Sequence, residues 1–317
     1  MNRIFGFALF ALICAALAPN AGFAAGAASK TGRIAFSSYR NGHGEIFVMN
    51  ADGTGLKRLT DFGKLRPGTA CSANSVFPGG TDDRSPAWSP DGRQIAFISY
   101  CDGNGSDATV LFVMDADGAH PRPLLKTDEN IPGANWTPDG KRLVFDSYKD
   151  SHSILNILNI ADGKRRALPV LGGAPASSPD WSPDGKMIAF AASTTADGLF
   201  QIFVMNADGS NPRKLTSLPS HATDPSWSPD AKRIAFNYGG NFGQYRIGVI
   251  NADGTGLRTV TAPGDYGPAH WSPDGARIVS SRGEVMKQNI ITVTPDGKEI
   301  SDLTPENIGD KDPSWTR

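Results

Sequence analysis

The chain has 317 residues, and its 31 Lys and Arg side chains nearly balance its 32 Asp and Glu side chains. This balance argues against a nucleic-acid-binding protein, which usually carries a basic surface. Hydrophobic residues make up 39% of the chain, enough to form a core, and the 36 Gly and 23 Pro favour a turn-rich fold.

The first residues are typical of a secretory signal peptide. Arg3 precedes an apolar run over residues 4–18, and small residues follow it. We expect a signal peptide over residues 1–24, with cleavage after Ala24 or, alternatively, after Ala27. No later stretch is apolar enough to cross a bilayer, so we expect no membrane insertion once the signal is removed. The expected location is the periplasm or the extracellular space.

Six Trp residues recur at intervals of 44 to 48 residues: Trp88, Trp136, Trp181, Trp227, Trp271 and Trp315. The first five are followed by Ser-Pro-Asp-Gly or a close variant, which is a tight-turn sequence. Seven residues after each of these five, a short apolar run begins, such as Ile95-Ala96-Phe97, and a second run and an Asp-Gly turn follow. Each unit predicts four short strands, and its length is typical of a propeller blade.

The two ends of the chain complement each other. Ile34-Ala35-Phe36 has no Trp before it at the expected distance, whereas Trp315 is followed by only two residues. We therefore predict an all-β fold, a six-bladed β-propeller of four-stranded blades that forms one domain over residues 31–317. The C-terminal strand would complete the first blade and close the ring, which hides otherwise exposed strand edges.

The repeated Trp-Ser-Pro-Asp-Gly, Ile-Ala-Phe, Phe-Val-Met-Asn and Asp-Gly elements resemble the C-terminal propeller of the TolB family over residues 31–317. In that family the propeller belongs to a periplasmic envelope system and binds the lipoprotein Pal. The resemblance thus implies a periplasmic, WD-repeat-like propeller with a Pal-like envelope lipoprotein as a candidate partner. TolB has an α/β domain before its propeller, and here the first propeller strand is expected at about Arg33, directly after the signal. We therefore expect a TolB-like binding or scaffold module and not a complete TolB.

The short repeated turns share one face of the ring, so the variable connections lie on the other face, where we expect function. Polar residues shortly before each Trp should lie near the mouth of the central channel on this face. The candidates are Asp83, Arg84, Asn135, Asp180, His221, Asp224, His270, Lys311 and Asp312. They would form a polar funnel for a peptide or a small ligand. Asp224 and Asp312 occupy equivalent positions of the repeat, so a turn-capping role is the alternative for these two.

Two long connections are expected on the variable face beside the same blade. The insertion at residues 61–84 contains Cys71, and the longest hairpin loop contains Cys101. We predict a disulfide between Cys71 and Cys101, with two free thiols as the alternative. Residues 102–107 carry oxygen ligands at alternate positions, as calcium loops do, but polar turn composition explains them more simply.

The sequence shows no strong enzyme motif. No His or Cys pair has the spacing of a zinc site, and no Gly-x-Ser-x-Gly motif is present. Loops could still bring His43, His152, His221 and His270 together around a metal. We expect a monomeric protein-binding or scaffold module, more than an enzyme, without cofactor or metal and with a protein as partner. The alternative is a carbohydrate-active lyase or hydrolase with its site at the channel mouth.

Overall fold

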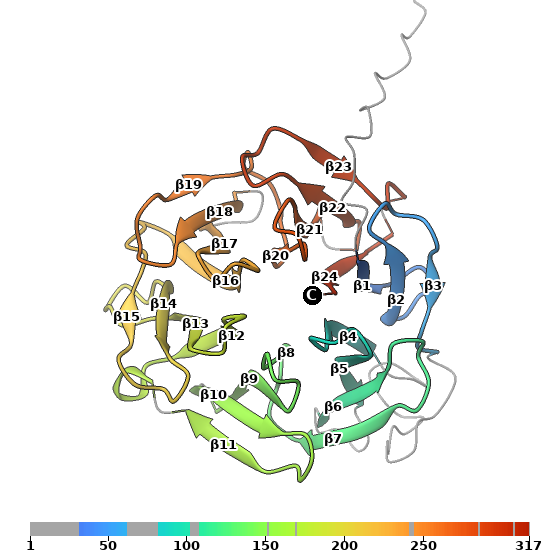
Figure 1. Cartoon of the computed structure of the whole chain (residues 1–317), viewed down its shortest axis with the longest axis horizontal. Coiled ribbons are helices and arrows are strands. Elements are labelled where there is room, and N and C mark those ends of the chain that lie inside the picture. Colours follow the sequence, from blue (N-terminus) through green and yellow to red (C-terminus); the bar gives the residue numbers. More distant parts are fainter. Residues whose placement is uncertain are drawn as a thin grey trace, which may run out of the picture.

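The computed structural model describes residues 32–61, 82–101, 108–150, 152–168, 170–240, 244–284, 286–306 and 308–316. Within these residues the chain forms six four-stranded antiparallel sheets, arranged as blades around a central channel (Figure 1). One strand of each blade lies at the channel and the other three follow outward. The predicted all-β fold and its six blades are confirmed.

From the channel outward, the first blade consists of β24 (Lys311–Trp315), β1 (Arg33–Ser38), β2 (Glu45–Asn50) and β3 (Lys57–Arg58). The second blade consists of β4 (Asp82–Trp88), β5 (Gln94–Cys101), β6 (Ala108–Asp115) and β7 (Arg122–Thr127). The third blade consists of β8 (Ala134–Trp136), β9 (Arg142–Lys149), β10 (His152–Asn159) and β11 (Arg165–Leu168). The fourth blade consists of β12 (Ala176–Trp181), β13 (Met187–Ala192), β14 (Gln201–Asn206) and β15 (Arg213–Lys214). The fifth blade consists of β16 (His221–Trp227), β17 (Arg233–Gly239), β18 (Arg246–Asn251) and β19 (Arg258–Thr259). The sixth blade consists of β20 (His270–Trp271), β21 (Ile278–Arg282), β22 (Asn289–Val293) and β23 (Ile300–Asp302). One short 3-10 helix, η1 (Leu171–Gly173), precedes β12. In the described part of the chain, no helix has the length and apolar character that crossing a membrane requires.

The ring closes through its two chain ends, as the sequence predicts. Strand β24 pairs antiparallel with β1, and Trp315 lies opposite Ile34 in the register. Two hydrogen bonds of 2.9 Å extend this pairing: the N–H of Arg33 donates to Oγ1 of Thr316, and the N–H of Thr316 donates to the carbonyl of Arg33. The first blade therefore contains one strand from the far end of the sequence.

The Ser-Pro-Asp-Gly turn is held by its own side chains. In the second blade, the hydroxyl of Ser89 donates to Oδ1 of Asp91 at 2.6 Å and accepts from the N–H of Gln94 at 2.9 Å. Gly92 has a φ of 67°, a conformation that L-residues disfavour. The same bonds recur in the other copies, so this motif forms a rigid scaffold turn. We call the face that carries these turns the turn face and the opposite face the loop face.

The hydrophobic core lies between neighbouring blades. Between the first two blades, for example, Ile46 and Val48 pack with Trp88, Ile95 and Phe97. Five other clusters of buried residues fill the remaining inter-blade spaces. Alternate residues of the middle strands therefore face opposite neighbours, so strands such as β13 and β14 are buried on both faces and read as apolar runs, whereas outermost strands such as β3 are exposed.

Several predictions fall outside the described residues. They are the signal peptide at residues 1–24, the loop at residues 102–107, and the disulfide, because Cys71 and the side chain of Cys101 are not described. These three stay predictions.

Candidate functional site

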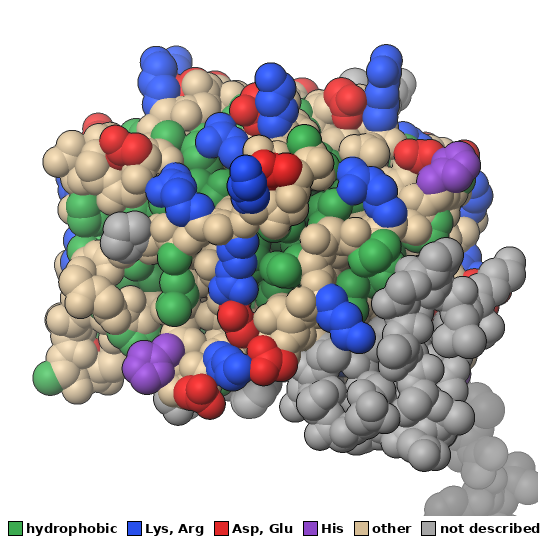
Figure 2. Space-filling view, turned by 90° about the horizontal axis from the view of Figure 1, so that it is seen from below, with side chains coloured by type: hydrophobic (Ala, Val, Ile, Leu, Met, Phe, Trp, Pro, Cys, Tyr) green, Lys and Arg blue, Asp and Glu red, His purple; other side chains and the backbone are tan. Residues whose placement is uncertain are grey.

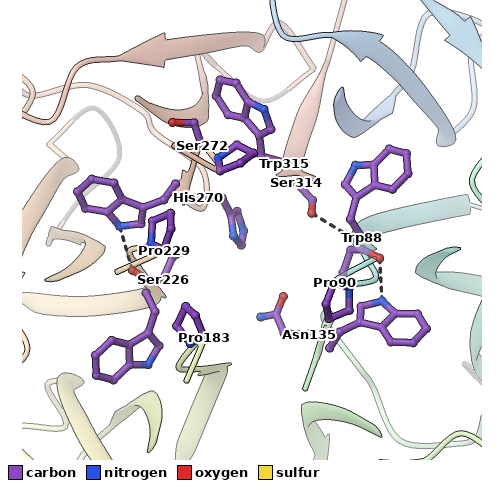
Figure 3. Close-up of a pocket in the computed structure, with 15 residues that line it drawn as sticks. Trp88, Pro90, Asn135, Pro183, Ser226, Pro229, His270, Ser272, Ser314 and Trp315 are labelled. Carbon is purple, nitrogen blue, oxygen red and sulfur yellow. Dashed lines mark hydrogen bonds between the residues drawn. The ribbon is translucent and has the colours of Figure 1, made fainter. Parts of the chain in front are cut away.

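The inner strands β24, β4, β8, β12, β16 and β20 surround a channel that contains two cavities. The cavity toward the turn face has a volume of about 190 Å³ and is lined by Trp side chains and turn prolines (Figure 3). The cavity toward the loop face, here called the mouth cavity, has a volume of about 220 Å³. Ala87, Asn135 and His270 line both cavities, so the two cavities meet at these residues.

Asn135 and His270 narrow the channel where the cavities meet. Each directly precedes a Trp, and their strands β8 and β20 belong to opposite blades of the ring. Figure 3 shows both side chains pointing toward the channel axis from opposite sides. Nδ2 of Asn135 donates to the carbonyl of Pro179 at 3.1 Å, which fixes the amide against the next blade.

Four inner strands share a backbone irregularity, a residue with positive φ, and the side chain of this residue lines the mouth cavity. Ser85, Ser178, Asp224 and Asp312 each stand directly before a proline and three residues before a Trp, and their φ values are 50° to 53°. The pairing of each inner strand with its neighbour shifts register at this point, as in a β-bulge. All four residues line the mouth cavity.

Three carboxyl groups line the mouth cavity: Asp146, Asp224 and Asp312. Ser178 joins the first two, because its N–H donates to Oδ1 of Asp146 at 3.1 Å and its hydroxyl donates to Oδ1 of Asp224 at 2.8 Å. Burial raises the pKa of Asp146 to about 6, and the nearby carboxylate of Asp224 adds to this rise. Burial also raises the pKa of Asp312, although Lys311 and Arg84 oppose the rise.

The structure thus places four of the nine predicted residues at the mouth cavity: Asn135, Asp224, His270 and Asp312. The other five are Asp83, Arg84, Asp180, His221 and Lys311, and they do not line it. Asp83 and Asp180 are buried. The Nδ1 atom of His221 accepts a hydrogen bond from the N–H of Phe200 at 3.2 Å.

Arg84 and Lys311 lie beside aromatic rings on the loop face. Arg84 forms an ion pair with Asp82, and its guanidinium lies 5.0 Å from the ring centre of Tyr100. Nζ of Lys311 lies 5.1 Å from the ring centre of Tyr39. The hydroxyl of Tyr39 donates to Asp82 at 2.7 Å, and burial raises the pKa of Tyr39 well above its usual range. These cations are therefore held outside the mouth cavity.

Asp146 was missed by sequence reasoning. It follows Phe145 in β9, a second strand of a blade, whereas the prediction considered only residues before each Trp. The signal that could have found it is a charged residue directly after the buried Leu143-Val144-Phe145 run. Ser37 holds the corresponding place in the first blade, where its hydroxyl accepts from the N–H of Ser85 at 3.1 Å. In these two blades, the side chain at this position anchors the bulge of the next inner strand.

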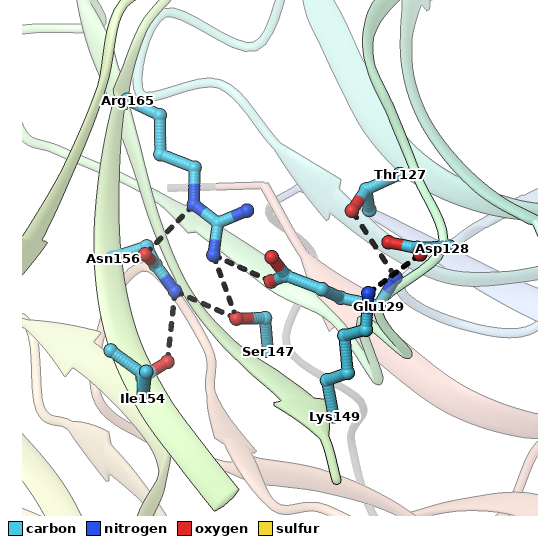
Figure 4. Close-up of polar contacts among 8 residues, drawn as sticks. All are labelled: Thr127, Asp128, Glu129, Ser147, Lys149, Ile154, Asn156 and Arg165. Atoms are coloured by element: carbon cyan, nitrogen blue, oxygen red, sulfur yellow. Dashed lines mark hydrogen bonds and ion pairs between the residues drawn. The ribbon is translucent and has the colours of Figure 1, made fainter.

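A polar network in the third blade fixes the loop that borders the mouth cavity (Figure 4). The guanidinium of Arg165 donates to Glu129 at 2.5 Å, to Ser147 at 2.9 Å and to Asn156 at 2.9 Å. The bond from Arg165 lowers the pKa of Glu129. Pro132 lies three residues after Glu129, and its carbonyl accepts a hydrogen bond of 2.7 Å from the hydroxyl of Ser85. The network therefore supports one wall of the cavity.

The four His side chains considered for a metal do not form a site with one another. Among the residues that the structure describes, no group of three or more His, Cys, Asp or Glu side chains has an arrangement suited to a metal ion. His152, for instance, is exposed at the start of β10, with Nδ1 2.7 Å from the carbonyl of Asp150.

The loop face carries more acidic than basic side chains among the described residues of its loops and strand ends. In Figure 2, Lys and Arg side chains protrude from the upper rim, and acidic and basic side chains stand side by side near both rims. Large hydrophobic side chains are exposed on both faces. Tyr148 and Ile154 are 48% and 45% exposed on the loop face, and Leu257 is 45% exposed on the turn face.

The fold and channel define a six-bladed β-propeller with an acid-lined mouth. Residues 101–317 match the TolB beta propeller domain family, so the chain belongs to this family. No curated protein sequence matches the chain.

Solved structures similar to this chain include TolB from Acinetobacter baumannii, with a TM-score of 0.74 and 18% identity over 90% of this chain and 67% of that one. A structure from Agrobacterium tumefaciens assigned to TolB has a TM-score of 0.63 and 18% identity over 90% of this chain and 99% of that one. An oligogalacturonate lyase in complex with manganese has a TM-score of 0.56 and 14% identity over 85% of this chain and 73% of that one. At these identities the likeness shows the fold alone.

Proposed function

We propose that this chain is an exported, protein-binding propeller that engages its partner through the loop face. The observation that carries the proposal is the mouth cavity, because it opens a concave site with apolar walls and acidic groups at the centre of the face where the blades differ most. The turn face, in contrast, is built from repeated self-bonded turns. Membership of the TolB propeller family supports a binding role.

The partner that we propose is a Pal-like envelope lipoprotein in the periplasm. The family supports this partner class, and the apolar stretch at residues 4–18 supports export. Exposed Tyr148 and Ile154 provide apolar contact area on the loop face, beside the exposed charged residues Lys149 and Asp150. Such a mixture of aromatic, aliphatic and charged groups is typical of protein interfaces.

Site-specific photocrosslinking tests this proposal. A photoreactive amino acid replaces Tyr148 or Ile154 on the loop face, and Leu257, which is equally exposed on the turn face, is the matched control position. We expect an envelope lipoprotein to be crosslinked in cells from the two loop-face positions and not from Leu257. Crosslinks only from Leu257, or no crosslink from either loop-face position, would contradict the proposal.

A further inference from the structure

The mouth cavity combines apolar walls with acidic groups. Five prolines line it, namely Pro86, Pro132, Pro179, Pro225 and Pro268, and the carboxyl groups of Asp146, Asp224 and Asp312 stand among them. No Lys or Arg side chain is among the described residues that line this cavity. A cavity of this composition fits a ligand with a hydrocarbon stem and a positively charged end.

Asp146 is the strongest single indication of a cationic ligand. The residue is only 5% exposed, yet it lines the cavity. Its Oδ1 accepts the N–H of Ser178, and no hydrogen bond to Oδ2 is found among the described residues. Asp312 lines the same cavity without a hydrogen bond from any described residue, although the charges of Lys311 and Arg84 act on it from outside the cavity. A buried carboxyl group with unused acceptor capacity is costly unless a donor or a cation approaches it.

We propose that the mouth cavity binds the side chain of a Lys or Arg residue from a basic segment of the protein partner. This inference rests on the proposed function, because the side chain would enter from the loop face. The alkyl stem would pack on the proline rings, and the ammonium or guanidinium group would donate to carboxyl groups among Asp146, Asp224 and Asp312. A bare metal ion fits less well, since the described carboxyl groups form no cluster suited to one. The acidic character of the surrounding face favours the approach of a basic segment.

Small probes test the cavity without the partner. N-acetyl-lysinamide and N-acetyl-argininamide carry the proposed side chains, and N-acetyl-norleucinamide has the stem without the charge. Calcium chloride is the metal probe. Binding to the full mature chain is followed by protein NMR shifts and calorimetry in low salt. We expect both cationic amides to bind, the norleucine amide to bind at least about tenfold more weakly, and added salt to weaken the cationic probes.

Variants locate the binding. In the double variant Asp224→Asn with Asp312→Asn, the affinity for N-acetyl-lysinamide should fall at least about tenfold. Asn accepts the positive φ of both positions, so the bulges are expected to persist. Asp150→Asn is the matched control, because Asp150 also has a positive φ and lies exposed on the loop face outside the cavity. The affinity of the Asp150→Asn variant for N-acetyl-lysinamide should equal that of the unaltered chain.

The outcomes separate this inference from the proposed function. Equal binding of the lysine and norleucine amides, binding of calcium alone, or equal losses in the double variant and Asp150→Asn would each overturn the cation cavity. Any of these results would leave crosslinking from Tyr148 and Ile154 unaffected. Probe binding that depends on Asp224 and Asp312, without crosslinks to an envelope protein, would instead overturn the proposed partner and retain the cavity.

Discussion

The backbone N–H of Trp227 donates a hydrogen bond of 2.7 Å to Oδ2 of Asp180. Asp180 lies in β12 and Trp227 ends β16, so a side chain of one blade holds the inner strand of the next. Ser314 occupies the equivalent position in β24, and its hydroxyl accepts from the N–H of Trp88 at 3.4 Å. At these two positions, the side chain before the Trp therefore joins neighbouring blades.

Replacing Asp180 tests this joint. Because Asp180 is buried and accepts a short bond, Asp180→Ala should lower the free energy of unfolding by about 2 kcal/mol. Ser314→Ala, which removes the longer bond, should cost less than about 1 kcal/mol. Urea unfolding followed by Trp fluorescence measures both. Losses of the same size would show that the length of this bond does not govern the coupling of the blades.

Removing residues 312–317 tests the closure of the ring. The truncation deletes most of β24, exposes the edge of β1 and removes Trp315 from the cluster that it forms with Ile34 and Phe36. We expect a loss of about 4 kcal/mol or more, because the buried Trp alone contributes on this scale. Thermal unfolding and size-exclusion chromatography would show the loss of stability and association through the open edge. A chain that lacks only Arg317 is the control, and equal melting of the two would refute the closure argument.

The sequence repeat was sufficient to predict the fold, but it predicted only some of the residues that line the mouth cavity. Trp spacing and turn chemistry act locally, so the six blades and the closing strand follow from sequence. The positive φ of Asp224 and Asp312 does not, because residues before proline normally favour extended backbone. These irregularities occur in four of the six inner strands, and at one of them Asp146 of a neighbouring blade accepts the N–H of Ser178. A single sequence does not show which side chains meet across blades.

The pKa of Asp146 predicts a pH dependence of stability. Its pKa rises from 3.8 to about 6 on folding, so the folded chain binds the proton more tightly than the unfolded chain does. The resulting stabilisation is fully present below pH 4 and is lost as the pH rises through 6, by about 3 kcal/mol in total. Asp146→Asn keeps an acceptor for the N–H of Ser178 and does not titrate.

The variant Asp146→Asn should therefore match the unaltered chain near pH 4 and exceed its free energy of unfolding near pH 7.5. Urea unfolding at several pH values measures the difference, and Asp150→Asn serves as the exposed control. A constant difference between variant and unaltered chain across this range would show that Asp146 does not titrate between pH 4 and 7.

The Ser-Pro-Asp turn of the fifth blade contains Ala231 where the other copies have Gly, and the φ of Ala231, 56°, lies in the left-handed region. Ala231→Gly should relieve this strain and raise the free energy of unfolding by about 1 kcal/mol, less a few tenths for the entropy of the unfolded Gly. Gly185→Ala is the reverse change in the fourth blade, where φ is 76° and a Cβ would meet no atom within 4 Å. That variant should lose about 1 kcal/mol by backbone strain alone. Chemical unfolding measures the free energy of unfolding of both variants. If the two substitutions change it in the same direction, φ at this turn position does not control the stability of the protein.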